Sequence, residues 1–129
     1  MKKRILSVLL TVVMLIGMLP TAVFAAETTY DIWVGGVQIT SANLVIDSSD
    51  NENIEGSATF DEATMTLTLT DFKCTGAYCP DDASESSVIR VTQDGITIVF
   101  FGENMITGTG DCGLQADVYG NIKLEAADE

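Results

Sequence analysis

Acidic side chains gather in three polar stretches, and they are the groups in this sequence best suited to bind a cation. Calcium binds where several hard oxygens, mostly carboxylates and backbone carbonyls, converge on one point. The candidate calcium ligands are Asp47, Asp50, Asp81, Asp82 and Asp111. The alternative for each stretch is a solvated acidic loop that serves solubility.

Three aromatic side chains form the second group with a chemical use. Trp33 lies on the polar side of an alternating segment, and Tyr78 and Tyr119 lie near glycines in turn-rich segments. The face of an aromatic ring carries partial negative charge, which suits the C–H groups of a sugar ring. We name these three residues as candidate carbohydrate contacts, with packing against the core as the alternative for each.

The residue types that many catalytic sites need are scarce in this chain. It has no histidine, which excludes Ser–His and Cys–His nucleophile pairs and histidine bases. A strong base for lyase chemistry would have to be Lys73, Arg90 or Lys123, and Arg90 is expected to point to solvent from a strand. We therefore predict a protein that is not an enzyme.

The segment 1–25 has the composition of a secretory signal peptide. Three basic residues precede an uncharged apolar run over 5–19, Pro20 ends the run, and Ala25 closes a small-x-small site. The run is shorter than the roughly 20 residues that span a bilayer, and a retained anchor is the alternative. We predict cleavage after Ala25, a single domain over 26–129, and a secreted or cell-surface location.

The charge of the mature chain limits its partners. After Ala25, three basic residues stand against 19 acidic ones, which gives a formal net charge of 3 − 19 = −16. Nucleic acids and anionic membranes are bound through basic patches. We therefore expect neither as a partner, and no contact with the membrane once the signal peptide is removed.

The elements that must position these side chains are short β-strands. Gly35-Gly36 between two alternating runs predicts a hairpin in which Val34 pairs with Val37 and Trp33 shares the other face with Gln38. A second hairpin is predicted over 58–72. Its turn lies at 61–64, and Leu67 and Leu69 point inward.

Strands then recur with the same neighbours in the same order. Short apolar strands begin at Leu67, Ile96 and Ile122, at nearly equal intervals, and the lead-in strand at Ile89 recurs at Leu114. Such recurrence is typical of the coils of a β-solenoid. The sequence therefore predicts an all-β chain in which hairpins lead into a short right-handed parallel β-helix of about two to three coils. A two-sheet β-sandwich is the alternative.

Two consequences follow from aligning the coils. Matching Thr75-Gly76 with Thr107-Gly108 puts Cys79 beside Cys112, within the Cα separation of a disulfide. A Cys79–Cys112 bridge is thus expected first, then Cys74–Cys79, with three thiols as the third possibility. The C-terminal strand has no visible cap, so we expect self-association or further coils at that edge.

Four segments of the chain resemble those of a known group of proteins. They are YDIWVGGVQITSAN at 30–43, MTLTL at 65–69, GITI at 95–98 and GENMITG at 102–108. The chain is similar to the calcium-containing, right-handed parallel β-helix carbohydrate-binding domains of secreted and surface proteins from anaerobic Gram-positive bacteria. The resemblance implies binding of plant or cell-wall polysaccharide, with acidic polymers such as polygalacturonate foremost. A structural spacer or adhesin segment of a larger surface protein is the alternative function.

Overall fold

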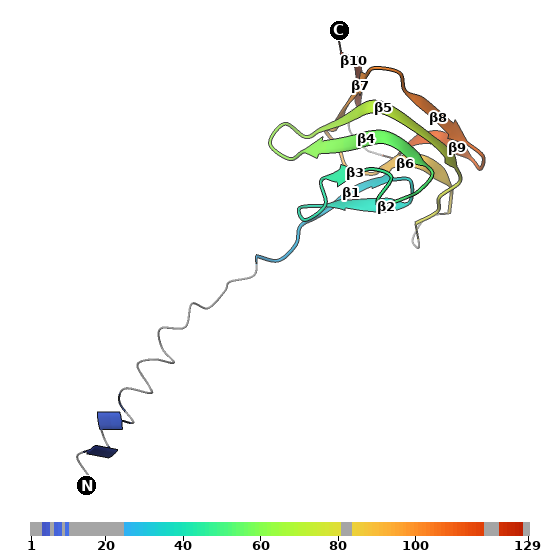
Figure 1. Ribbon diagram of the computed structural model, residues 1–129. Helices are drawn as coiled ribbons and strands as arrows, with labels where there is room; N and C mark the ends of the chain where they lie inside the picture. The colour runs from blue at the N-terminus through green and yellow to red at the C-terminus, as the bar shows by residue number, and fades with distance from the viewer. Residues whose placement is uncertain are drawn as a thin grey trace.

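A computed structural model describes residues 4–5, 7–8, 10, 25–80, 84–117 and 122–127 of the chain. In these residues ten strands form two mixed sheets, neither of them closed into a barrel (Figure 1), so the all-β prediction is confirmed. The strands are β1 (Thr29–Val34), β2 (Val37–Thr40), β3 (Val45–Ile46), β4 (Ile54–Asp61), β5 (Thr66–Gly76), β6 (Ser87–Val91), β7 (Thr97–Phe101), β8 (Met105–Gly108), β9 (Cys112–Ala116) and β10 (Lys123–Ala126). Most of the predicted signal peptide lies outside the described residues.

The four-stranded sheet has the strand order β2-β1-β6-β9. β1 and β2 form the predicted hairpin, with Val34 opposite Val37. β1 then pairs antiparallel with β6, and β6 pairs parallel with β9. Ile89 lies opposite Leu114, which confirms the predicted alignment of these two segments.

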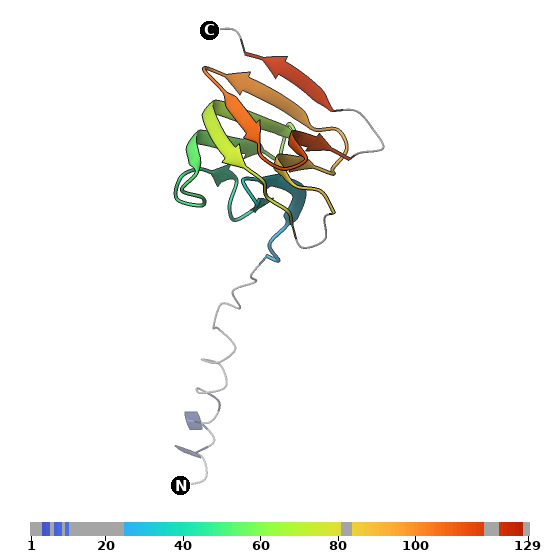
Figure 2. The same ribbon diagram turned by 90° about the vertical axis from the view of Figure 1, so that its right-hand side faces the viewer.

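The six-stranded sheet has the order β10-β7-β5-β4-β3, and β8 also pairs with β5. The predicted β4–β5 hairpin is present, and its Leu67 and Leu69 are fully buried. β7 and β10 add to this sheet in parallel, one beyond the other, at the end of the molecule farthest from β1 and β2 (Figures 1 and 2).

The predicted alignment of Leu67 with Ile96 is wrong, because Leu67 lies opposite Ile98. A shift from Ile96 to Ile98 keeps the side chain on the same face of the strand. Ile96 and Ile98 are both buried, so the pattern predicted the inward face but could not fix which of the two is the partner.

A corner divides β5 into two halves, the first beside β7 and the second beside β8. At this corner Asp71 has a positive φ of 46°, and the opposite strand bulges at Gly56, where φ is 71°. A Cβ atom at Gly56 would lie 2.3 Å from the carbonyl oxygen of Asp71. The corner therefore requires glycine at position 56 on steric grounds as well as for its backbone conformation.

Asn104, in the loop between β7 and β8, stabilises the same corner. Its Oδ1 accepts a hydrogen bond from the Phe72 amide at 2.9 Å, and its Nδ2 donates to the Phe101 carbonyl at 3.0 Å. The neighbouring Glu103 amide donates to the Asp71 carboxylate at 2.9 Å. These bonds connect successive corners of the chain, so the side chain of Asn104 has a structural role.

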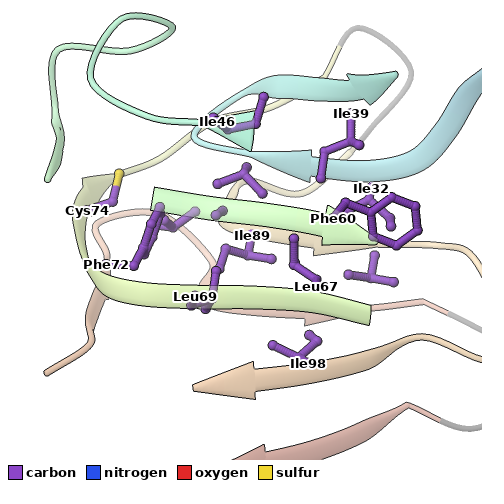
Figure 3. Packing of buried hydrophobic residues seen from close by; sticks show 14 of the residues in the cluster. Ile32, Ile39, Ile46, Phe60, Leu67, Leu69, Phe72, Cys74, Ile89 and Ile98 are labelled. Carbon is purple, nitrogen blue, oxygen red and sulfur yellow. The ribbon is translucent and has the colours of Figure 1, made fainter. Parts of the chain in front are cut away.

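The apolar core lies between the two sheets (Figure 3). Ile32, Ile39 and Ile89 enter it from the four-stranded sheet, and Phe60 and Leu67 from the six-stranded sheet. All five are at most 2% exposed. Burial of such side chains stabilises a fold by about 1.5–3 kcal/mol each, and here it fixes which face of each strand remains outside.

Candidate functional site

Four side chains form a row across the outer face of the four-stranded sheet. Gln38 lies opposite Trp33, Trp33 opposite Arg90, and Arg90 opposite Gln115, so each strand of the sheet contributes one member. Neighbouring residues of these strands are buried in the core, and successive side chains on a strand point to opposite faces. We call Gln38, Trp33, Arg90 and Gln115 the outer row.

Trp33 and Arg90 are in contact within this row. The Cζ atom of Arg90 lies over the indole ring of Trp33, 5.7 Å from its centroid, which is within the range of a cation–π interaction. Both side chains are half-buried. The prediction that Trp33 shares a face with Gln38 is confirmed by their register.

The guanidinium of Arg90 is short of partners. Its Nε and Nη1 atoms are buried from solvent and make no hydrogen bond to any residue that the structure describes. Lys73 forms an ion pair with Glu103 at 3.7 Å, and Lys123 forms one with Glu125. Among the described residues no such ion pair is formed by Arg90. Its side chain lies on the outer face of the sheet, as expected, but with these two nitrogens buried it is only partly solvated.

Gln115 has an unpartnered atom as well. Its Nε2 donates a hydrogen bond of 2.7 Å to the Glu85 carboxylate, while its Oε1 is buried and accepts none from the described part of the chain. This orientation of the amide follows from Glu85, because an ionised carboxylate can only accept. The outer row thus contains unused donors on Arg90 and an unused acceptor on Gln115, on adjacent strands.

The other aromatic candidates lie elsewhere. Tyr78 packs over backbone: a Cβ atom added at Gly76 or Gly36 would meet its ring at 2.5 Å or 3.2 Å. Its hydroxyl lies 3.8 Å from Sγ of Cys74. These contacts give the ring a packing role beside the β1–β2 turn. Tyr119 lies outside the described residues.

The carboxylates of Asp47 and Asp50 serve their own loop. Asp47 accepts hydrogen bonds of 2.7 Å from both the amide and the hydroxyl of Ser49, and these bonds lower the pKa of its carboxyl. Asp50 accepts from Asn43 at 2.9 Å and from the Asp47 amide at 3.1 Å. The two side chains thereby define the turn that precedes β4.

Asp111 is bound to Ser86 rather than to other carboxylates. Its carboxylate accepts bonds of 2.8 Å from the Ser86 amide and 3.0 Å from the Ser86 hydroxyl, and these lower its pKa. Asp81 and Asp82 lie outside the described residues. Within the part of the chain that is described, no three acidic or cysteine side chains come together as a metal site.

Cys74, Cys79 and Cys112 are thiols in this structure, and the predicted Cys79–Cys112 bridge is not formed in it. The expectation extended the register of Gly76 with Gly108 onward to the cysteines. That register holds as far as the glycines, but beyond them Ser87 becomes the partner of Cys112. The residue beside Cys112 on the neighbouring strand is therefore a serine.

A shallow depression of about 280 Å³ lies on the other sheet. Its lining residues are Asn53, Glu55, Lys73, Cys74, Thr75 and Met105. The positive charge here is already compensated, because Lys73 pairs with Glu103. The outer row combines a half-buried aromatic ring with a positive charge that has no ion pair among the described residues, and this makes it the better candidate site.

Sequence reasoning could find only part of the outer row. The alignment of Ile89 with Leu114 places Arg90 beside Gln115, but nothing in the sequence marks Arg90 as a ligand. The contact of Trp33 with Arg90 depends on the antiparallel pairing of β1 with β6. No repeat in the sequence indicates that pairing, since β1 precedes the recurring segments.

Comparison with known proteins gives no relative: no family model, no curated protein and no solved structure matches the chain. No helix in the described ranges has the length and apolar character needed to cross a membrane.

Proposed function

We propose that this chain is an exported, non-catalytic module that binds acidic plant or cell-wall polysaccharide at the bacterial surface. The observation that supports the proposal is the outer row, in which Trp33 stands between Gln38 and Arg90. Carbohydrate sites combine an apolar or aromatic surface with a few fixed polar groups. The row offers both on a rigid sheet.

We further infer that the strands from β5 onward are successive coils of a right-handed parallel β-helix. The two halves of β5 and then β6 are followed in the same order by β7, β8 and β9, each parallel to its counterpart. β10 adds to β7 in the same way. In such a solenoid the faces are extended, which suits a polymer ligand.

The calcium-assisted form of binding stays a prediction. Asp47, Asp50 and Asp111 accept hydrogen bonds from nearby loop groups, so a calcium ion would have to displace those donors. The part of the prediction that depends on Asp81 and Asp82 lies outside the described residues. Binding by the outer row needs no metal.

Affinity electrophoresis tests the proposal. The purified protein is run through native gels with and without polygalacturonate, in calcium and in chelator. We expect retardation by the polymer, and we expect the Trp33→Ala variant to lose most of it. Phe101→Ala is the matched control, because Phe101 is a 46% exposed aromatic residue on the other sheet.

A structural spacer or adhesin segment is the alternative function. It is favoured by β10, which lies at the edge of its sheet and leaves Leu124 56% exposed. An open edge can pair with a further strand. A folded protein that migrates equally in gels with and without polymer would support the spacer, and retardation would contradict it.

A further inference from the structure

The outer side of β10 is an open strand edge. β10 is the last strand of the six-stranded sheet, and no described strand pairs with it on the side away from β7 (Figures 1 and 2). An unpaired edge offers a row of backbone N–H and C=O groups to a further strand. The backbone geometry and the charges of β10 indicate which strand fits.

Alternate residues of β10 direct their backbone groups to this open side. The amide of Lys123 donates to the Ile96 carbonyl at 3.1 Å, and the amide of Ala127 donates to β7 at 2.9 Å. Successive residues on a strand direct their backbone groups to opposite sides. The N–H and C=O groups of Leu124 and Ala126 therefore point away from β7 and can bond to a new strand.

The side chains of β10 divide into an apolar and a charged face. Leu124 lies opposite Ile98, which is buried in the core, yet Leu124 itself is exposed. Lys123 and Glu125 lie on the other face and form an ion pair within the strand. A strand that adds here should thus bring an apolar residue to Leu124 and a charge of opposite sign to each of the other two.

We propose that this edge binds the same edge of a second copy of the chain, by antiparallel pairing of β10 with β10 across a twofold axis at Leu124. The two Leu124 residues then form a hydrogen-bonded pair through their outward N–H and C=O groups. On the charged face, Lys123 of each copy lies opposite Glu125 of the other, an arrangement that stabilises paired strands. The twofold axis makes the contact self-complementary and closed.

Charge disfavours the two nearest alternative registers. Because only alternate residues have outward backbone groups, the second copy can shift only in steps of two residues. One such step places Glu125 opposite Glu125 of the second copy, and the opposite step places Lys123 opposite Lys123. Like charges directly opposite each other destabilise an antiparallel pair. The sequence of β10 therefore selects the register centred on Leu124.

The net charge of the chain, with 19 acidic residues against six basic ones, opposes self-association. At about 0.15 M salt this repulsion is largely screened beyond about 8 Å. Residues directly opposite on paired strands have Cβ atoms about 4.5–5.5 Å apart, which is within that distance. The complementary charges at β10 can therefore act where the repulsion between the rest of the two molecules is screened.

Sedimentation velocity of the purified protein in about 0.15 M salt, from about 1 μM to about 1 mM, measures the association. The variants are Lys123→Glu, Glu125→Lys, the two together, and Leu124→Pro. Lys73→Glu is the matched control: it makes the same change of charge and also removes an ion pair, but Lys73 lies inside the sheet between β4 and β8. Thermal unfolding in dilute solution confirms that each variant is folded.

The wild type is expected to form a dimer that dissociates on dilution. Lys123→Glu and Glu125→Lys should each weaken the dimer at least about tenfold, since each places like charges opposite each other at both ends of the pairing. The double substitution restores opposite charges and should restore the dimer. An equimolar mixture of the two single variants should dimerise for the same reason, and Lys73→Glu should behave as the wild type.

Leu124→Pro tests the backbone pairing. The outward amide of Leu124 makes no bond to β7, and proline is accommodated on an edge strand where the N–H faces solvent, so this variant should be folded and monomeric. The proposal is overturned by a wild type that stays monomeric, by a dimer that persists in Leu124→Pro or Lys123→Glu, or by its loss in Lys73→Glu. Failure of both the double variant and the mixture to dimerise would overturn it equally. None of these results depends on glycan binding.

Discussion

The side-chain oxygen of Asn104 accepts a hydrogen bond of 2.9 Å from the backbone amide of Phe72, on a strand much earlier in the chain. The same side chain donates to the Phe101 carbonyl at 3.0 Å. One residue therefore joins the corner inside β5 to the corner between β7 and β8. β5 pairs in parallel with β7 before its corner and with β8 after it. The contact therefore stabilises the parallel pairing on both sides of the corner.

We predict that Asn104→Ala lowers the free energy of unfolding by about 1–3 kcal/mol, since it leaves the partly buried Phe72 amide without an acceptor. Urea unfolding followed by circular dichroism measures the change. Asn53→Ala is the control: Asn53 is exposed and bonds within its own turn, so a change within about 0.5 kcal/mol is expected. Equal effects of the two substitutions would contradict the role assigned to Asn104.

Two glycines with positive φ should respond differently to substitution by alanine. At Gly95, where φ is 77°, an added Cβ meets nothing within 4 Å, and the cost is that of the left-handed backbone, about 1–2 kcal/mol. At Gly56 the Cβ would also meet backbone at 2.3 Å. Gly56→Ala should therefore cost at least about 2 kcal/mol more than Gly95→Ala in urea unfolding, and a smaller difference would show that the bulge can relax.

Arg90→Met should stabilise the protein. The substitution removes the buried Nε and Nη1 atoms, which have no hydrogen-bond partner among the described residues, and it loses the cation–π contact with Trp33. The net gain in free energy of unfolding is expected to be about 1 kcal/mol. A lowered unfolding midpoint would mean that Arg90 contributes to stability.

The stability of the fold should fall in acid partly through Asp111. Hydrogen bonds from the amide and hydroxyl of Ser86 lower the pKa of this carboxyl from its ordinary value of 3.8. A group whose pKa is lower in the folded state contributes stability above its unfolded pKa, and this is lost as pH falls through the folded value. Asp111→Asn should therefore be less stable than the wild type at neutral pH, and the difference should narrow below pH 3.8.

Unfolding midpoints of the wild type and Asp111→Asn, measured from neutral pH down into the acid range, test whether the difference in stability between them becomes smaller. Asp117→Asn, which removes the same charge at an exposed position just beyond β9, is the control. A difference between Asp111→Asn and the wild type that stays constant with pH would contradict the assignment.

The three cysteines should react with a thiol reagent in the order of their exposure. Cys79 is exposed, Cys112 is half-buried, and Cys74 is buried. Burial raises the pKa of the Cys74 thiol, which lowers its reactive thiolate fraction. Mass spectrometry of briefly alkylated protein should find Cys79 modified first and Cys74 last. Protection of both Cys79 and Cys112 in oxidised protein, reversed by reductant, would instead establish the disulfide.

Much of the local structure could be predicted from the sequence because it depends on short-range rules. Alternation and the Gly35-Gly36 turn predicted the first hairpin and the pairing of Val34 with Val37. The recurrence of the strand at Ile89 predicted its pairing with Leu114. These predictions succeeded because side chains on a strand alternate strictly, so a register that buries the apolar set is strongly preferred.

What only the tertiary structure decided is how non-recurring parts meet. β5 pairs with β8 so that Gly76 lies opposite Gly108, but β6 pairs with β9 so that Ser87, and not Cys79, lies opposite Cys112. The antiparallel pairing of β1 with β6 brings Trp33 to Arg90 from distant parts of the sequence. Neither of these two pairings can be recognised from a local sequence pattern, because each depends on how loops of unequal length connect the strands. The sequence by itself determined which residues could face outward, and the packing of the two sheets determined which of them stand together.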